Sequence, residues 1–97
     1  MGVMETIKDC CDQLAVQAQV VMDLQPEYTK EQALDFAIGS AIDTARRARK
    51  REGYFSRSMT SDVLESYALY ASVAEDARAN TYRPSTGNVR EYVLGLV

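Results

Sequence analysis

Residues 29–53, TKEQALDFAIGSAIDTARRARKREG, hold the strongest structural signal in this chain. Thr29 and Gln32 occupy the two positions of a helical capping box, in which each side chain satisfies the backbone N–H group of the other residue. The apolar residues that follow recur in steps of three and four: Leu34, Ile38, Ala41, Ala45 and Ala48. Gly53 supplies the left-handed stop that often follows a helix. The stretch therefore predicts a helix over residues 30–51.

One flank of this predicted helix carries unusually small side chains. They are Ala33, Ala37, Gly39, Ser40, Ala41 and Thr44. Small side chains allow the backbones of two helices to approach closely. We therefore expect other helices to pack against residues 30–51 on two sides, as they do around the central helix of a bundle or of a dimer interface.

Two more long helices are predicted on either side of this one. The first spans residues 3–23, ends before Pro26, and has this apolar repeat: Met4, Ile7, Cys11, Leu14, Ala18 and Val21. The other starts at a cap provided by Thr60, Ser61 or Asp62. Its apolar face is Val63, Tyr67, Tyr70, Val73, Ala74 and Ala77. Both repeats have the helical spacing of three and four residues.

A short last helix is predicted over residues 89–96, with Asn88 and Glu91 at capping positions. A strand is the alternative there, because the valine and tyrosine content also suits a sheet, but a lone strand would have no partner. The fold class is therefore all-α, with three long helices and a short C-terminal helix in an antiparallel bundle or hairpin. Residues 1–97 suit a single small domain, and the narrow alanine-rich faces favour a homo-oligomer, most simply a two-fold dimer.

Six cations lie within twelve residues of an otherwise acidic chain: Arg46, Arg47, Arg49, Lys50, Arg51 and Arg57. The formal net charge is −6 over residues 1–45, +5 over residues 46–57 and −2 over residues 58–97, so that the whole chain carries −3. At about 100° per residue, most of these cations point away from the apolar face of the predicted helix, and Arg49 lies at the edge of that face. We therefore expect one continuous basic patch that faces solvent.

Two kinds of partner fit such a patch, although none is strictly needed, because cations at a helix C-terminus are stabilised by the helix dipole alone. Arginine-rich patches bind carboxylates and phosphates. The partner would be an acidic protein surface, or a nucleic acid on which Tyr54 and Phe55 stack. The acidic charge of the whole chain favours the protein partner.

The candidate partner-binding residues are five of these cations together with three aromatic side chains: Arg46, Arg47, Lys50, Arg51, Arg57, Phe36, Tyr54 and Phe55. Phe36 lies on the polar side of its helix, where a large apolar side chain suggests that something covers it. The last helix or residues 82–87 would cover it within the chain; otherwise a partner would. Leu69 lies outside the apolar face of the third helix, and we expect it to be exposed.

The residue content argues against catalysis. The chain has no His, which is the usual general base at neutral pH, and no glycine-rich phosphate loop. Its only cysteines, Cys10 and Cys11, are adjacent, and we expect both to be buried as small apolar residues. We expect no catalytic residue, no cofactor and no metal site.

Charged residues interrupt the N-terminal stretch, and no run approaches the about eighteen apolar residues of a membrane span. With two unpaired cysteines, these features favour a cytoplasmic protein with no membrane partner. The function that we expect is that of a non-enzymatic protein-binding module: an adaptor, an accessory subunit or a small inhibitor of a larger complex, which covers a surface of its partner through the basic patch. The alternatives are a small nucleic-acid-binding regulator that uses the same patch, and a structural oligomer whose basic patch meets its own acidic first helix.

Overall fold

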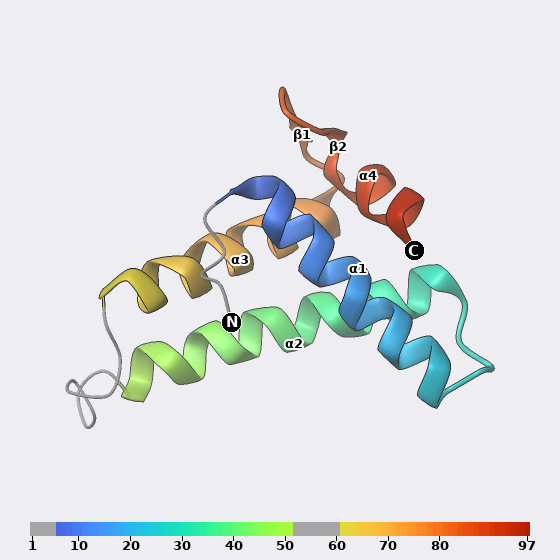
Figure 1. Cartoon of the computed structure of the whole chain (residues 1–97), viewed down its shortest axis with the longest axis horizontal. Helices are drawn as coiled ribbons and strands as arrows, with labels where there is room; N and C mark the ends of the chain where they lie inside the picture. The colour runs from blue at the N-terminus through green and yellow to red at the C-terminus, as the bar shows by residue number, and fades with distance from the viewer. Residues whose placement is uncertain (1–5, 52–60) are drawn as a thin grey trace.

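Four helices and a short β-hairpin make up the fold in the computed structural model, which describes residues 6–51 and 61–97 (Figure 1). The helices are α1 (Ile7–Leu24), α2 (Lys30–Arg51), α3 (Ser61–Ala79) and α4 (Val89–Leu96). The hairpin consists of β1 (Tyr82–Arg83) and β2 (Gly87–Asn88). The predicted all-α class, with three long helices and a short C-terminal helix, is confirmed.

Two helices begin where their capping residues predicted. At the start of α2, the Gln32 N–H donates to Thr29 Oγ1 at 3.1 Å, and the Thr29 N–H donates to Gln32 Oε1 at 2.9 Å. At the start of α4, Asn88 Oδ1 accepts the Glu91 N–H at 3.0 Å. Because these side chains satisfy backbone groups that the first helical turn leaves unpaired, they fix the first residue of each helix. The choice of helix over strand for residues 89–96 is confirmed.

The prediction that the first helix starts at residue 3 was wrong. Thr6 has an extended backbone, with φ −125° and ψ 161°, and is the N-cap of α1. The Asp9 N–H donates to Thr6 Oγ1 at 3.0 Å, and the Thr6 N–H donates to Asp9 Oδ2 at 3.2 Å. This capping box was not predicted, because the apolar repeat continues back to Met4, which lies outside the described residues.

The β-hairpin was not predicted. Asn80 ends α3 in the left-handed conformation, with φ 57°, and the Thr81 N–H donates to the Asp76 carbonyl oxygen at 2.9 Å. The register pairs Tyr82 with Asn88 and Arg83 with Gly87 in an antiparallel ladder. Gly87 has a φ of +76°, which glycine adopts without a steric penalty. Strands of two residues are too short to show an alternating sequence pattern.

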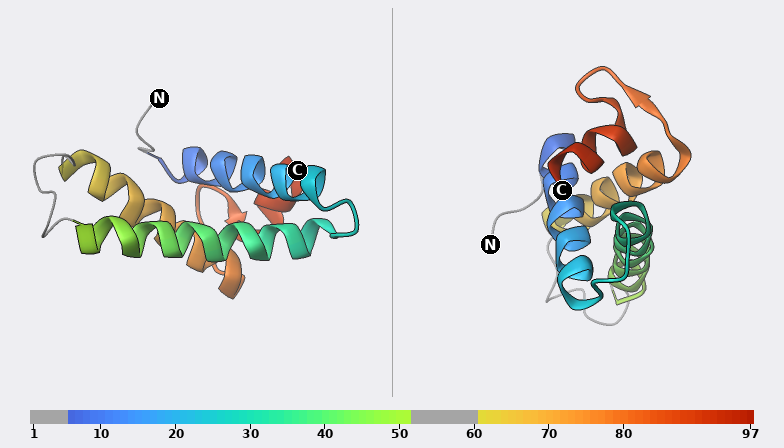
Figure 2. Two further views of the ribbon diagram at one scale, coloured as in Figure 1. Left: turned by 90° about the horizontal axis from the view of Figure 1, so that it is seen from below. Right: turned by 90° about the vertical axis from the view of Figure 1, so that its right-hand side faces the viewer.

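The helix α2 is central to the packing. It packs against α1 and α3, while α4 packs against both α1 and α3 (Figures 1 and 2). Its buried residues are Ala33, Leu34, Ala37, Ile38, Ala41, Ile42 and Ala48. The expected packing on two sides is therefore confirmed for Ala33, Ala37 and Ala41, whereas Ser40 and Thr44 of the same small flank are exposed.

The core extends from α2 into the other three helices. The largest of its fully buried side chains are Leu14, Leu34, Ile38, Val73, Val89, Val93, Cys10 and Cys11. Both adjacent cysteines can be buried because α1 contacts α2, α3 and α4. Leu69, which we expected to be exposed, is partly buried against this core because α3 also has neighbours on more than one side.

Polar contacts attach the C-terminal region to α2. Arg90 Nη1 of α4 lies 2.8 Å from Asp35 Oδ1 of α2. Lys30 Nζ donates to the Val97 carbonyl oxygen at 2.9 Å, which brings the C-terminus beside the start of α2. Within the described ranges, no helix is long and apolar enough to cross a membrane.

Leu14 and Leu24 provide a matched test of this core, because Leu14 is fully buried in α1 whereas Leu24 at its end is 73% exposed. We expect Leu14→Ala to lower the free energy of unfolding by about 2–5 kcal/mol, because it removes buried apolar surface and leaves a cavity. Leu24→Ala should change it by less than about 0.5 kcal/mol. Urea denaturation followed by circular dichroism measures both, and equal losses would contradict the packing described here.

Candidate functional site

The four described cations at the end of α2 are exposed, and three of them line two different hollows. Arg46, Arg47, Arg49 and Lys50 all reach solvent. Consecutive side chains on a helix differ by about 100° in direction, and α3 packs against one side of α2 only. Arg46 and Arg49 therefore lie beside α3, whereas Arg47 lies in a hollow formed by residues of α2 alone. These three cations therefore line two different hollows, and the continuity of the basic patch, which includes side chains outside the described ranges, stays a prediction.

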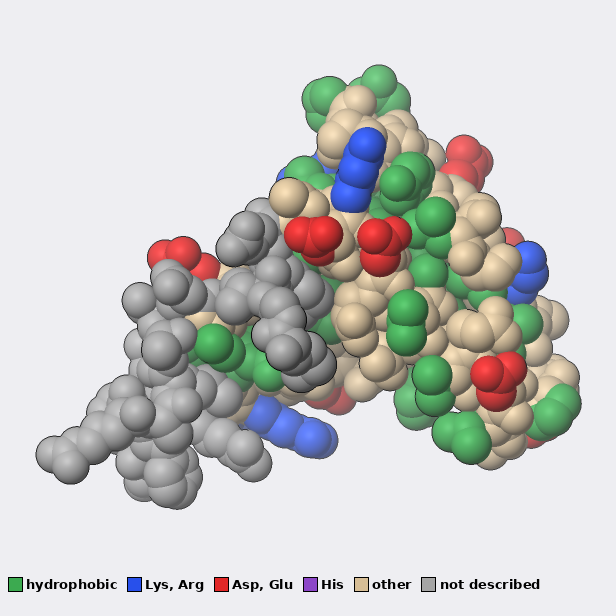
Figure 3. All heavy atoms as spheres, viewed as in Figure 1, with side chains coloured by type: hydrophobic (Ala, Val, Ile, Leu, Met, Phe, Trp, Pro, Cys, Tyr) green, Lys and Arg blue, Asp and Glu red, His purple; other side chains and the backbone are tan. Residues whose placement is uncertain are grey.

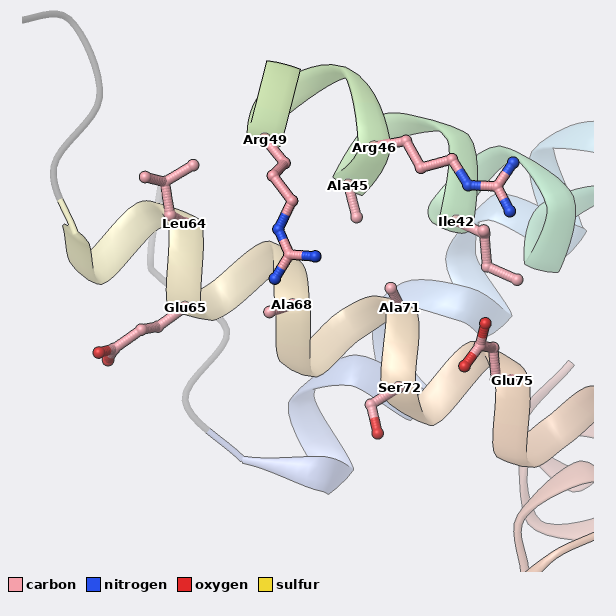
Figure 4. Close-up of a pocket in the computed structure, with 10 residues that line it drawn as sticks. All are labelled: Ile42, Ala45, Arg46, Arg49, Leu64, Glu65, Ala68, Ala71, Ser72 and Glu75. Carbon is pink, nitrogen blue, oxygen red and sulfur yellow. The ribbon is translucent and has the colours of Figure 1, made fainter. Parts of the chain in front are cut away.

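The first surface is a groove between α2 and α3, with a volume of about 530 Å³ (Figure 4). Ala45, Ala68 and Ala71 give it a floor of small apolar side chains. We call it the α2–α3 groove, and it is lined by Ile42, Ala45, Arg46, Arg49, Leu64, Glu65, Ala68, Ala71, Ser72 and Glu75. The arginines of the groove come from α2 and its glutamates from α3, so that its two edges carry opposite charges.

The side chains at the edges differ in direction. In Figure 4, Arg49 extends from α2 across the groove toward Ala68, and Glu75 points toward α2, while Glu65 points away from the groove. Neither Arg46 nor Arg49 forms an ion pair with any residue that the structure describes. Their guanidinium groups, each with five N–H donors, are therefore available to carboxylates outside the chain.

A partly buried ion pair borders this groove. Arg83 Nε of the hairpin pairs with the Asp76 carboxylate of α3, and Arg83 Nη2 donates to Ser72 Oγ at 3.3 Å. Because Ser72 also lines the groove, this contact attaches the hairpin to the edge formed by α3. Sequence spacing carried no signal for the pair, since Arg83 meets Asp76 only after the chain turns back at the end of α3.

The second surface is the outer side of α2, where Phe36 and Arg47 lie along one face. A hollow there is lined by Asp35, Phe36, Gly39, Ser40, Asp43, Thr44 and Arg47. Phe36 is 59% exposed. Neither α4 nor residues 82–87 therefore covers it within the described part of the chain.

An exposed apolar stripe on α1 was not predicted. Val16 is 54% exposed and Val20 is 43% exposed, and Leu24 continues the series at the end of the helix. Residues four apart lie on the same helix face, so the spacing of these three could have revealed the stripe. Figure 3 shows hydrophobic side chains on the molecular surface along the course of α1, with acidic side chains on the same face.

The thiols of Cys10 and Cys11 are buried on the side of α1 that faces the core, as expected. Burial is the main reason why the pKa of Cys10 and that of Cys11 are raised from 9.0 to about 11. Negative charges on Asp9, Asp12 and neighbouring groups act in the same direction, and the positive charge of Arg83 acts against them. The thiols therefore stay protonated near neutral pH. No cluster of three or more potential metal ligands occurs in residues 6–51 and 61–97.

Four of the predicted partner-binding side chains cannot be placed on either surface. Tyr54, Phe55 and Arg57 lie outside the described residues, as does the side chain of Arg51. Lys50 is exposed in the last turn of α2. Of the described site residues, Arg46 and Arg49 lie in the groove, Phe36 and Arg47 lie on the outer side of α2, and Lys50 lines neither hollow.

Comparison with family models, with curated proteins and with solved structures gives no significant match for this chain. The residues of the two surfaces are therefore the basis for a function. The groove presents guanidinium donors along one edge of an apolar floor, which is an arrangement suited to binding a surface that carries carboxylates.

The buried thiols predict a pH dependence of stability. Between about pH 9 and pH 11 the unfolded chain loses the two thiol protons while the folded chain keeps them, so the free energy of unfolding falls as the pH rises. The loss should approach about 1.4 kcal/mol per pH unit for each thiol. Urea denaturation at pH 8.5, 9.5 and 10.5 measures it, and the double variant Cys10→Ala/Cys11→Ala should give a shallower slope. The same slope in both proteins would contradict the prediction.

Proposed function

We propose that this protein is a non-enzymatic protein-binding module that holds an acidic segment of a partner protein in the α2–α3 groove. The observation that supports it is the position of Arg46 and Arg49, which are exposed at the edge of an apolar groove and have no ion pair among the described residues. By contrast, Arg83 and Arg90 are both paired with aspartates. Unpaired arginines beside an apolar floor are suited to binding a partner.

Charge and apolar burial contribute differently to such binding. An exposed ion pair contributes only about 0.2–1 kcal/mol, so most of the affinity has to come from apolar surface buried against the alanine floor. Arg46 and Arg49 instead speed the encounter and set its orientation. Glu75, which points toward α2 from the opposite edge, disfavours negative charge there. The partner segment should therefore carry its acidic residues along one side and an apolar face next to them.

The floor residues also favour a helical partner. Ala45, Ala68 and Ala71 are small, and small side chains let a third helix approach the α2 and α3 backbones closely. An amphipathic helix in a groove between two helices is a recurrent mode of recognition. A module that binds in this way covers the segment that it holds, which is the action shared by adaptors, accessory subunits and small inhibitors. The cytoplasm, where buried thiols remain reduced, is the proposed location.

Charge reversal in the groove tests this function. We expect the tagged full-length chain to capture an acidic protein in stoichiometric amount from the cells that make it. Arg46→Glu/Arg49→Glu should lose that protein, because both edges of the groove would then be acidic. Arg78→Glu is the matched control, since Arg78 is also an exposed arginine in the last turn of a long helix, yet it is not among the residues that line the groove.

Two outcomes would contradict the proposed function. One is the capture of the same proteins, in the same amounts, by the double variant and the wild type. The other is binding of oligonucleotides that weakens steeply with added salt and is lost in Arg46→Glu/Arg49→Glu, which would identify a nucleic acid as the ligand of the groove. Fluorescence anisotropy with single- and double-stranded oligonucleotides at low salt tests the second outcome. We expect no binding of either kind of oligonucleotide.

A further inference from the structure

We infer that the solvent side of α1 is a second docking surface, which takes a basic amphipathic helix of another protein. We call this surface the α1 outer face. Its residues are Asp9, Asp12, Val16, Val20, Asp23 and Leu24. None of them lines the α2–α3 groove, so the inference does not depend on the proposed function.

The position of α1 leaves this face uncovered. In Figures 1 and 2, α1 crosses α2 on one face of the molecule. Ala18 of α1 is fully buried, and every residue of the α1 outer face lies at least about 120° from it around the helix. Val16, Val20 and Leu24 are each more than two-fifths exposed. No element in the described part of the chain therefore covers these three side chains.

The three apolar side chains form a single row along α1. Their spacing of four residues makes this row one of the ridges of the helix, and such a ridge packs between the same ridges of a second helix at a crossing angle of about 50°. By helical geometry, Asp12 and Asp23 lie on one side of the row, and Gln13 and Gln17 lie on the other. A partner helix that buries the row therefore meets carboxylates along one edge only.

The charge around this face determines the chemistry of the partner. Residues 6–31 carry two cations and five anions, a net charge of −3, which are Lys8 and Lys30 with Asp9, Asp12, Asp23, Glu27 and Glu31. Such a surface repels the phosphates of nucleic acids and of anionic lipids, and it attracts lysine and arginine side chains. The occupant is therefore a protein helix that carries cations beside its apolar face.

Contacts within the chain do not neutralise this charge. Neither Asp12 nor Asp23 forms an ion pair with any residue that the structure describes. Lys8 lies only about 80° from the buried Ala18, which places it outside the face. Arg83 of the hairpin also acts on α1, but on the thiols of its buried side, and Arg83 is itself paired with an aspartate.

A synthetic peptide tests the inference on the full chain. The probe is a labelled helical peptide of about 20 residues, long enough to cover the 18 residues of α1, with leucines along one face and lysines at its edge. Its counterpart has glutamate in place of each lysine. Fluorescence anisotropy at about 1 μM to 1 mM protein covers the range of moderate and weak association. The lysine peptide should bind, and added salt should weaken the binding because the ion pairs are exposed.

Three double variants locate the bound peptide. Val16→Ser/Val20→Ser should weaken the binding at least about tenfold, because the apolar row is lost. Asp12→Asn/Asp23→Asn should weaken it about threefold to tenfold. Asp43→Asn/Glu75→Gln is the matched control, since it removes two exposed carboxylates from α2 and α3, and it should stay within about twofold of the wild type. All variants should keep the helical circular dichroism of the wild type, because the replaced side chains are exposed.

Four outcomes would overturn the inference. The first is no binding of the lysine peptide at the highest concentration, and the second is equal binding by Val16→Ser/Val20→Ser and the wild type. The third is binding of the glutamate peptide that is lost in Val16→Ser/Val20→Ser, because the face would then prefer the opposite charge. The fourth is a wild-type dimer, measured by sedimentation velocity, that is lost in the same variant, because a second copy of this chain would then be the occupant.

Discussion

The close packing of α2 between α1 and α3 is the constraint on which the rest of this structure depends. Ala33, Ala37 and Ala41 are small and buried, so both neighbours approach the α2 backbone. With those sides occupied, the cations at the end of α2 can project only along its remaining flanks. Because consecutive residues point in directions about 100° apart, one run of arginines contributes to two different surfaces. The helix dipole still stabilises these cations, but it does not determine which flank each one occupies.

Local chemistry explains which parts of the fold were predictable. The helix α2 has both a capping box and an apolar repeat, and its predicted bounds match the structure from Lys30 to Arg51. Asn88 likewise identified the start of α4. For α1 the two signals disagreed: the apolar repeat ran past the Thr6 capping box, and the cap decided where the helix begins. The hairpin is attached to α3 by an ion pair between Arg83 and Asp76, which forms only in the folded chain.

The candidate site was predictable as a set of residues but not as a geometry. Arg46, Arg47 and Phe36 were recognised because charge density and helical spacing are local properties. The glutamate edge of the groove could not be foreseen, since a surface formed by two helices depends on how each helix is rotated against the other. The stripe of Val16 and Val20 is different, because its spacing of four is visible in the sequence. It was overlooked because the core repeat of the same helix is stronger.

The central claim is that Arg46 and Arg49 belong to one surface while Arg47 and Phe36 belong to another. The most direct test is capture of the acidic partner by Arg46→Glu/Arg49→Glu and by Arg47→Glu, each compared with the wild type. If the groove alone binds the partner, the double variant should lose it, whereas Arg47→Glu should retain it within about twofold, because Arg47 does not line the groove. Loss of the partner in both variants would contradict the account, since it would show that the cations act as one patch.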